Sequence, residues 1–405
     1  MINRPDYIAA IEPFIDKPLV KILAGIRRCG KSTIFEMLRE ELLRRGIGED
    51  QIVCKRYTEM DIPENITAKQ MYDELTAAMA GKGHCYLLLD EIQEITGWEK
   101  AVNSLLESAD ADIYVTGSNS KLMSSEISTY LTGRYVSIPV YTLSFKEYLD
   151  FKADSTLSRR ELLEEYIRFG GFPIVALSEY DEQSAYQIVN GIYHTVVSRD
   201  IVKRHRINKQ DLFDRVVKYI IENMGKTFSA NSISTFLKSE HRKVSVESIY
   251  NYLRWLEQAF IIYPCERYDL QGKSILKTQE KYYLADVSLK YALLGYNRKM
   301  LDGAMENIVY LELKRRGYDV YIGKNDTKEI DFVAPRRAHL CAGLRPDPRS
   351  IGPRSGEPDG DPRPLPQICC YPQRDGYRHR GRHPDRSPRG FSACRTMVII
   401  FRLIR

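Results

Sequence analysis

A nine-residue segment near the start of the chain combines residue types suited to phosphate chemistry. Residues 25–33, GIRRCGKST, fit the pattern GxxxxGK[ST]. Glycines let backbone N–H groups turn inward around phosphate oxygens, while a lysine and a hydroxyl supply a cation and a Mg²⁺ ligand. We therefore predict a site for ATP and Mg²⁺, with Ser32 on the metal. The predicted nucleotide-contacting residues are Gly25, Arg27, Arg28, Cys29, Gly30, Lys31, Ser32 and Thr33.

Three of these side chains have a second interpretation. Arg27 and Arg28 could face solvent or a partner instead of the phosphates. Cys29 lies near an expected helix N-terminus, where the pKa of a thiol can fall. The simpler interpretation is that Cys29 fills a variable position of the loop.

Two carboxylates follow a second apolar segment, residues 85–91, CYLLLDE. The segment is typical of a buried strand. Asp90 at its end could hold Mg²⁺, and Glu91 could polarise an attacking water. The alternative is a solvated acidic loop after a structural strand. The phosphate-binding loop (P-loop) upstream favours the metal and catalytic roles.

Polar residues also follow an expected strand at residues 112–117. Asn119, or Ser118 beside it, could sense the γ-phosphate or position water, or the pair could simply form a turn. Arg134 follows a glycine typical of a helix C-cap and could act as an arginine finger or form a surface ion pair. The catalytic candidates are therefore Glu91, Asn119 and Arg134.

The elements that would position these residues alternate between strand and helix. An apolar run at 18–25 precedes the glycine loop, and apolar residues recur at helical spacing from Ile34 to Leu42. Strands at 85–90 and 112–117 flank an expected helix at 98–109. This alternation predicts an α/β P-loop NTPase fold, a parallel sheet with flanking helices.

Several segments resemble the prokaryotic ATPases of the AAA+ superfamily that carry a C-terminal domain of unknown function. They are KILAGIRRCGKST, CYLLLDEIQE, VTGSNSKLMSSE and LTGRYVSIPVYTLSFKEY. The resemblance extends to about residue 334. It implies ATPase activity and leaves the biological role open. It implies Walker A roles for Lys31 and Ser32, Walker B roles for Asp90 and Glu91, a sensor at Ser118 or Asn119, and a finger at Arg134.

The middle of the chain is expected to form a winged-helix module. Helices are predicted at 212–224, 229–237 and 245–260, followed by a hairpin-like stretch at 261–277. Such a module could place a helix in the major groove of DNA. Interleaved glutamates favour instead a role in packing or oligomer contacts. The candidate phosphate-binding cations are Lys238, Arg242, Lys243 and Arg254.

The third region resembles part of the restriction-endonuclease-like fold. Glu306 lies on an expected helix at 302–316, and Asp331 lies on an expected strand at 329–333. In that fold a following lysine would help to assemble the metal site, but no lysine occurs after Lys328. We therefore expect a truncated domain in which both acids serve structure, without nuclease activity.

The positive charge of the chain is concentrated at one end. The 405 residues have a net charge of +6, yet residues 335–405 contain 15 Arg, no Lys and 6 acids. Residues 1–334 carry a net charge of −3, so the overall charge does not indicate nucleic-acid binding. We hypothesise a frameshift near Ala334. The alternative is a disordered Arg/Pro-rich arm that binds nucleic acid, and resequencing of the locus distinguishes the two.

These features predict a Mg²⁺-dependent ATPase that couples hydrolysis to movement of a C-terminal module. The alternatives are a nucleotide-gated DNA-binding regulator with little turnover and a nuclease-associated ATPase. Expected partners are ATP, an unknown protein client, further copies of the chain and DNA. Neither a leader nor a membrane-length apolar run is visible, which predicts a cytoplasmic protein. The expected divisions are an AAA+ domain (1–150), a helical linker (151–210), a winged-helix-like module (211–280), a truncated endonuclease-like domain (281–334) and the tail (335–405).

Overall fold

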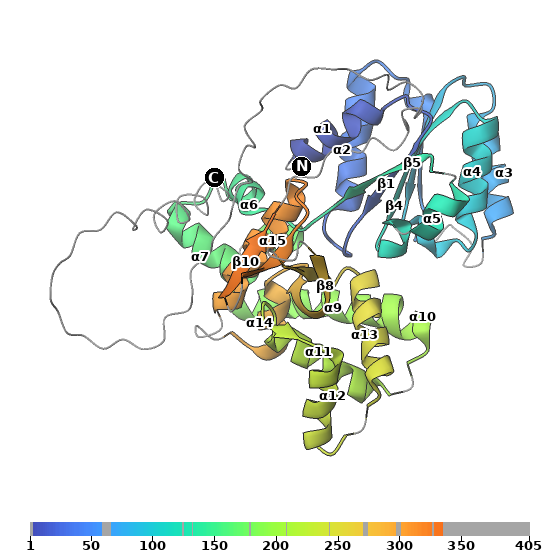
Figure 1. Ribbon diagram of the computed structural model, residues 1–405. Helices are drawn as coiled ribbons and strands as arrows, with labels where there is room; N and C mark the ends of the chain where they lie inside the picture. Colours follow the sequence, from blue (N-terminus) through green and yellow to red (C-terminus); the bar gives the residue numbers. More distant parts are fainter. Residues whose placement is uncertain are drawn as a thin grey trace, which may run out of the picture.

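A computed structural model gives the fold of the chain (Figure 1). It describes residues 3–58, 66–123, 125–131, 133–177, 180–207, 209–242, 244–269, 274–296, 301–325 and 328–334. The tail at 335–405, and with it the frameshift hypothesis, lies outside the described residues. Lys243, one of the candidate DNA contacts, also lies outside them.

The N-terminal part is a five-stranded parallel sheet in the order β2-β3-β4-β1-β5. Both β1 and β3 are buried along their whole length, because a parallel sheet is covered on both faces. The α/β P-loop NTPase fold predicted from the sequence is thus confirmed. The strands are β1 Val20–Ala24, β2 Ile52–Arg56, β3 Cys85–Asp90, β4 Ala111–Gly117 and β5 Tyr135–Pro139.

Helices cover the two faces of this sheet. Figure 1 shows α1 with α2 on one side and α3 with α4 on the other. The helices are α1 Pro5–Ile11, α2 Lys31–Arg44, α3 Ala68–Met79, α4 Trp98–Ser108 and α5 Ser125–Tyr130. Short 3₁₀ turns connect them: η1 Glu12–Phe14, η2 Glu49–Gln51, η3 Ile92–Glu94 and η4 Ser120–Met123.

The carboxyl ends of β1, β3 and β4 meet at one edge of the sheet. Ala24 lies opposite Gly117, and Leu89 lies opposite Val115. Parallel pairing therefore places the P-loop, Asp90 and the segment after β4 side by side, although they are far apart in sequence. This edge is where ligands bind in open α/β sheets.

The C-terminal part begins with helices that pack against this edge and against each other. A π-helical turn, η5, interrupts the helical run after α9. Ser245 caps α13 as expected, since its hydroxyl accepts a hydrogen bond from the Ser248 amide at 3.1 Å. The helices are α6 Phe145–Phe151, α7 Arg159–Phe169, α8 Pro173–Ala176, α9 Glu182–Val196, η5 Val197–Val202, α10 Lys203–His205, α11 Gln210–Glu222, α12 Ala230–Ser239, α13 Val246–Gln258, α14 Ser288–Leu294 and α15 Leu301–Arg315.

A second five-stranded sheet, in the order β10-β9-β7-β8-β6, joins the last two expected modules. Strand β7 pairs antiparallel with β8 on one edge and parallel with β9 on the other. The expected division at residue 280 falls inside β8, so it does not coincide with a structural boundary. The strands are β6 Thr227–Phe228, β7 Ile262–Asp269, β8 Ser274–Leu284, β9 Tyr321–Asn325 and β10 Lys328–Val333.

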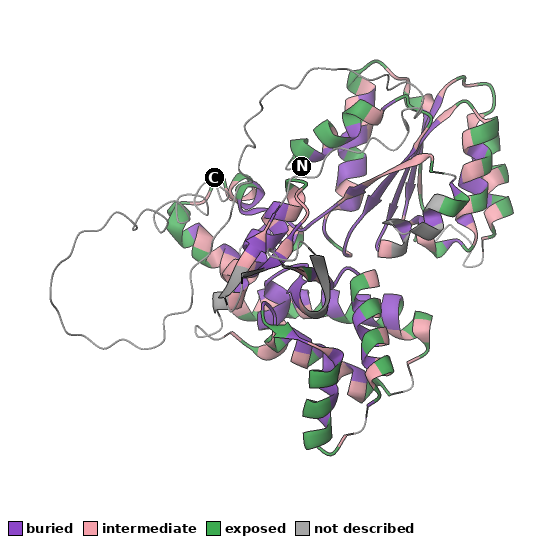
Figure 2. Ribbon diagram, viewed as in Figure 1, coloured by how far each residue is buried: buried purple, intermediate pink, exposed green. Residues whose placement is uncertain are grey.

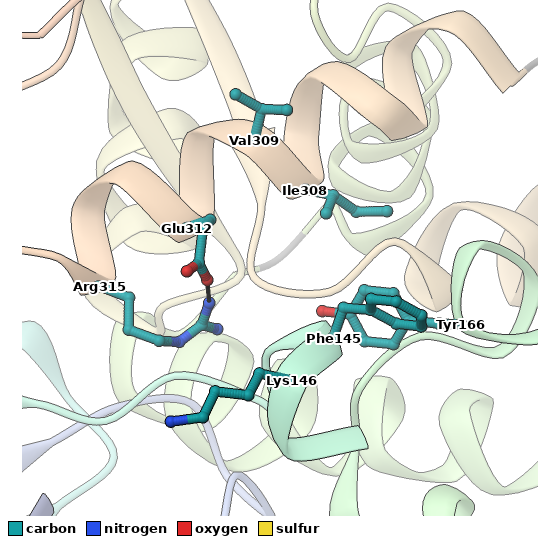
Figure 3. A pocket seen from close by; sticks show the side chains of 7 residues that line it. All are labelled: Phe145, Lys146, Tyr166, Ile308, Val309, Glu312 and Arg315. Carbon is teal, nitrogen blue, oxygen red and sulfur yellow. Dashed lines mark hydrogen bonds and ion pairs between the residues drawn. The ribbon is translucent and has the colours of Figure 1, made fainter. Parts of the chain in front are cut away.

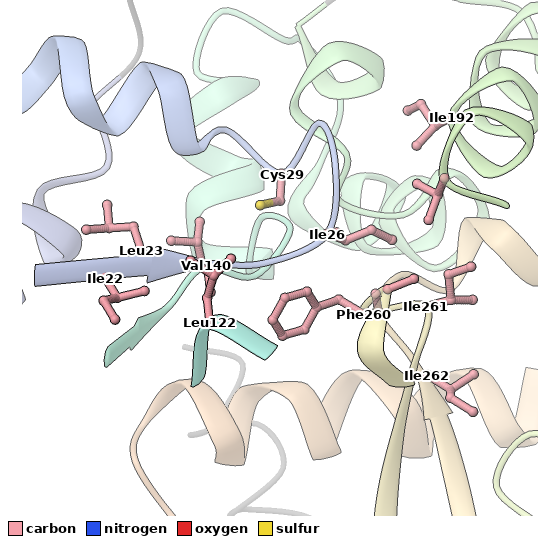
Figure 4. Packing of buried hydrophobic residues seen from close by; sticks show 14 of the residues in the cluster. Ile22, Leu23, Ile26, Cys29, Leu122, Val140, Ile192, Phe260, Ile261 and Ile262 are labelled. Atoms are coloured by element: carbon pink, nitrogen blue, oxygen red, sulfur yellow. The ribbon is translucent and has the colours of Figure 1, made fainter. Parts of the chain in front are cut away.

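One continuous hydrophobic cluster extends from the first sheet into the C-terminal helices. Figure 2 shows buried residues on the strands and on the inner helix faces, with exposed residues on the outer faces. In Figure 4, Ile26 at the start of the P-loop faces Phe260 and Ile261, which follow α13. The C-terminal part is therefore packed directly against the loop that was predicted to bind phosphate.

Helix α15 packs beside α6 and the segment that follows β5. Figure 3 shows Glu312 and Arg315 of α15 near Phe145 and Lys146 of α6 around a small cavity. The Arg315 guanidinium donates to the Thr142 carbonyl at 3.0 Å.

Within the described residues, no helix is both long and apolar enough to cross a membrane.

Candidate nucleotide site

Two glycines of the P-loop are required by its geometry. A Cβ at Gly25 would lie 2.0 Å from the Val140 carbonyl oxygen. Gly30 precedes α2 with a φ of 100°, a left-handed conformation that side chains disfavour. No side chain caps the N-terminus of α2. Its first N–H groups can therefore bind an anion, as the GxxxxGK[ST] pattern predicts.

Lys31 is the buried cation of the loop. Its ammonium donates to the carbonyl oxygens of Gly25 and Ile26 at 3.0 and 3.2 Å. It also lies 3.6 Å from a carboxylate oxygen of Glu91. Lys31 and Glu91, to which the resemblance gives Walker A and Walker B roles, thus form an ion pair with each other.

Ser32 and Asp90 lie in direct contact. The Ser32 hydroxyl donates to Asp90 Oδ2 at 2.7 Å, and the Arg56 guanidinium reaches the same oxygen at 3.1 Å. Thr116 of β4 donates to the other oxygen. Hydroxyl and carboxylate oxygens are the ligands that Mg²⁺ prefers, together with phosphate and water. This donor pair fits the predicted metal.

A cavity of about 110 Å³ opens beside the Ser32–Asp90 pair. It lies between the start of α2 and the carboxyl ends of β2 and β3. The pattern of the sequence did not reveal β2 or Arg56, because the apolar part of this strand is only Ile52–Cys54 and two adjacent cations, Lys55 and Arg56, follow it. The lining residues are Ser32, Phe35, Glu36, Cys54, Lys55, Arg56, Leu88 and Asp90.

Glu91 has a left-handed backbone, with a φ of 56°, that turns it away from the strand. Its carboxylate accepts hydrogen bonds from the Gln93 amide at 2.6 Å and the Ser118 hydroxyl at 3.2 Å. Burial would raise its pKa, but the charges of Lys31 and Arg27 outweigh this, and the pKa lies below its ordinary value of 4.5. The carboxylate is therefore ionised at neutral pH, as a base for water must be.

The segment after β4 reaches the site as predicted from its position on the strand. Ser118 and Asn119 are both buried. The Ser118 hydroxyl contacts the Glu91 carboxylate directly. The Asn119 carbonyl accepts a hydrogen bond from the Leu122 amide at 3.1 Å, and this bond lies at the start of η4. The contact to Glu91 makes Ser118 a second candidate beside Asn119 for the sensor role.

The two arginines of the loop differ in their surroundings. Arg28 is exposed, with a φ of 67°. Arg27 is mostly buried and forms a bidentate pair with Asp200, whose oxygens lie 2.7 Å from Nε and 3.0 Å from Nη2. Asp200 belongs to η5 and is 173 residues away in the sequence. No local pattern in the sequence could have predicted this partner.

Behind the loop, Arg4 is fully buried and holds three segments together. Its guanidinium donates to the Cys29 carbonyl at 2.8 Å, to the Tyr141 carbonyl at 3.0 Å and to Glu147 at 2.7 Å. Cys29 itself is inaccessible, and burial raises the pKa of its thiol. The cysteine therefore fills space in the loop, and an activated thiol is excluded.

Arg134 lies away from the other site residues. It immediately precedes β5, whose first residue pairs with Val20 at the start of β1, whereas the P-loop follows the end of β1. Its guanidinium contacts Asn103 at 3.0 Å and Glu107 at 2.6 Å on α4. The structure thus does not bring Arg134 to the nucleotide edge of its own chain.

The two acids of the third region also have structural partners. Glu306 accepts from Lys281 at 2.9 Å and from the Tyr283 hydroxyl at 2.5 Å. Asp331 lies near enough to Glu306 to help raise the pKa of that carboxyl, although burial is the larger cause. Among the described residues, no group of three or more His, Cys, Asp or Glu side chains is suited to a metal.

Two of the cations predicted to contact DNA bind other side chains of the chain. Arg242 forms an ion pair with Asp211, and Arg254 donates to Asn251 at 2.9 Å. Helix α13 lies against η4 of the ATPase part. Its Trp255 stacks on His205 with ring centroids 4.4 Å apart. These contacts support the packing role that the interleaved glutamates indicated.

Comparisons with known proteins agree with this geometry. Residues 17–149 match the family described as AAA domain, and residues 160–299 match a domain of unknown function, DUF8612. An uncharacterized protein of Haemophilus influenzae is 37% identical over 337 residues, which cover 82% of this chain and 84% of that protein. An uncharacterized protein of Methanocaldococcus jannaschii is 33% identical, over 78% of this chain and 71% of the relative.

The fold is also similar to that of a solved structure, a Walker-type ATPase of Pyrococcus abyssi. The TM-score is 0.52 at 15% sequence identity, covering 72% of this chain and 96% of the other. The site and the fold define a nucleotide-binding protein of the P-loop class. The chain belongs to the prokaryotic AAA+ P-loop ATPases that carry a C-terminal domain of unknown function.

Proposed function

We propose that this protein hydrolyses ATP with Mg²⁺ and uses the cycle to move its C-terminal part. The contact between the Ser32 hydroxyl and Asp90 at 2.7 Å carries this proposal, because it brings together a hydroxyl and a carboxylate, two oxygen ligands suited to Mg²⁺, next to the P-loop. When bound there, Mg²⁺ would supply positive charge that neutralises the phosphates. Ser32 and Asp90 would hold it, and Lys31 would bind the phosphates.

Glu91 would accept the proton of the attacking water. Its carboxylate is ionised and is oriented by Ser118 and Gln93. The water oxygen bonds to the γ-phosphorus, the bond to the β–γ bridging oxygen breaks, and ADP leaves with that electron pair. Arg134 lies at the other edge of the sheet, so we propose that it could serve only the nucleotide of a neighbouring subunit in a homo-oligomer.

Movement of the C-terminal part is supported by the contacts around the loop. Ile26 packs against Phe260 and Ile261, and α13 lies against η4 after the sensor residues. Loss of the γ-phosphate would alter both surfaces at once. We propose that α11, β6, α12, α13, β7 and β8 act as a winged-helix-like module whose partner is a protein client, with DNA as the alternative ligand.

The test uses two substitutions with different expected results. Lys31→Ala removes the phosphate cation and should weaken ATP binding by at least about 100-fold, whereas Glu91→Gln should leave binding within a few-fold and stop turnover. Binding is followed with a fluorescent ATP analogue and turnover by phosphate release, with and without DNA. Unchanged ATP binding by Lys31→Ala would refute the proposal.

A further inference from the structure

Asp200 binds one edge of the Arg27 guanidinium, and the other edge points toward Glu91, the proposed base. Asp200 accepts from Nε and Nη2, at 2.7 and 3.0 Å. The remaining nitrogen, Nη1, lies 3.5 Å from Glu91. The pairing thus uses the fork geometry of arginine to fix the direction of Nη1, which points toward Glu91.

The Nη1 group of Arg27 lies where negative charge would develop during the proposed hydrolysis. Both Lys31 and Arg27 lie within 3.6 Å of the same Glu91 carboxylate, and both come from the loop that would cradle the phosphates. A water held by Glu91 and a γ-phosphate held by Lys31 would therefore have Arg27 beside them. Arg134, by contrast, is at the opposite edge of the sheet.

Asp200 is suited to a positioning role by its own surroundings. Its side chain is 3% exposed, and it lies in the π-helical turn η5. Turns of this kind re-aim side chains and are frequent at functional sites. Glu94, also near Arg27 at 3.2 Å, is considerably more exposed and can hold the guanidinium less firmly.

We propose that Arg27 is the cation that stabilises the γ-phosphoryl charge within its own chain, and that Asp200 of the C-terminal part positions it. This inference rests on the proposed ATPase function. As water attacks the γ-phosphorus and its proton passes to Glu91, the charge on the γ-oxygens is stabilised by Arg27 Nη1. Movement of η5 would then release Arg27, so turnover depends on the placement of the C-terminal part.

The experiment separates binding from transition-state stabilisation. Arg27→Gln should lower kcat by about 1,000-fold, the low end of known arginine fingers. Asp200→Asn should lower kcat by about 10-fold at unchanged KM, and Asp200→Glu should restore part of the loss. Arg39→Gln and Asp211→Asn are matched controls, since each breaks an exposed ion pair elsewhere, and both should keep kcat within 2-fold or so.

A second readout does not require turnover. Aluminium fluoride with ADP mimics the transferring phosphoryl group, so its presence should tighten ADP binding by the full-length protein. Arg27→Gln and Asp200→Asn should lose most of this gain while binding ADP alone as the unsubstituted protein does. Loss of ADP binding would overturn the proposal, because the pair would then only hold the loop in shape. A rise in kcat of Asp200→Asn would also overturn it, since Asp200 would then restrain Arg27.

Failure of this inference is distinguishable from failure of the ATPase proposal. If Lys31→Ala abolishes ATP binding and Arg27→Gln still hydrolyses ATP at the normal rate, the ATPase proposal is supported and the proposed role of Arg27 is wrong. If Lys31→Ala binds ATP normally, the P-loop assignment fails first. Both outcomes come from one binding and turnover series on the same chain.

Discussion

At the scale of single residues, the site is an arrangement of charges that balance one another. Lys31 and Arg27 face Glu91, and Ser32 and Arg56 face Asp90. Each phosphate-binding or metal-binding group thus already has an opposite charge or a hydrogen bond. Binding of Mg²⁺-ATP would exchange these internal contacts for contacts with the ligand.

The lowered pKa of Glu91 predicts a particular pH profile. Because the folded pKa lies below 4.5, the carboxylate stays ionised as the pH falls from about 8 to about 6, and kcat/KM should show no acid limb from Glu91 in that range. Removal of a neighbouring cation in Arg27→Gln should raise this pKa and move the limb upward. Measured kcat/KM reports the free enzyme. An acid limb in this pH range that shifts when Glu91 is replaced by Asp would contradict the prediction. An acid limb that Glu91→Asp leaves in place would come from another group.

The buried pair of Arg4 and Glu147 predicts a large effect on stability. Arg4→Met leaves Glu147 buried without its cation and should lower the free energy of unfolding by about 3–5 kcal/mol. Urea unfolding near neutral pH measures this. Lys146→Met is the control, since its pair with Asp6 is exposed and 3.5 Å long; a similar cost for both variants would contradict the prediction.

The same pair has a defined pH dependence. Burial would raise the pKa of Glu147, but the hydrogen bond and charge of Arg4 outweigh it, so the folded pKa is lowered from 4.5. A lowered carboxyl pKa contributes stability above the unfolded pKa, and this contribution is lost as the pH falls through the folded pKa. The difference in stability between the unsubstituted protein and Arg4→Met should therefore shrink in acid.

At the scale of elements, the turn between α7 and α8 connects the two parts of the chain. The Gly171 amide donates to Asp286 at 2.8 Å, and the Leu143 amide donates to the Gly171 carbonyl at 2.7 Å. The following Pro173 approaches the P-loop, 3.7 Å from the position of a Cβ on Gly30. This glycine turn thus forms a structural junction next to the candidate nucleotide site.

A pair of glycines tests this junction. Gly170 has a φ of 74°, and a Cβ there would lie 1.7 Å from Asp286 Oδ1, whereas Gly295 has a φ of 82° and no atom of the described residues within 4 Å of such a Cβ. Gly295→Ala should cost about 1–2 kcal/mol for backbone strain alone. Gly170→Ala adds a steric clash and should cost clearly more, as measured by thermal unfolding. Equal costs would mean that Asp286 moves freely.

The elements differ in how far the sequence could predict them. The P-loop, β3 and β4 were recognised because each has a local pattern: glycines before a helix, or an apolar run before polar residues. Strand β2 lacks such a run, and its Arg56 was missed. The pairing of Arg27 with Asp200, across 173 residues, depends on packing that no periodicity encodes.

At the scale of the whole molecule, the nucleotide edge is built from both parts of the chain. The first sheet supplies the loop and the acids, while the C-terminal part supplies Asp200, Asp286 and the apolar cover over Ile26. Local patterns located the first set and gave no role to the second. Through the pairing of Asp200 with Arg27, the C-terminal part would influence the rate of ATP hydrolysis.

The shared second sheet has a practical consequence for dissecting this protein. Because β7 pairs with β8 on one side and with β9 on the other, any fragment that ends before β9 exposes the backbone of β7 along one edge. Unpaired edges of this kind recruit other chains and promote aggregation. Insolubility of such a fragment would therefore report a bare strand edge and would say nothing about the autonomy of the helices before it.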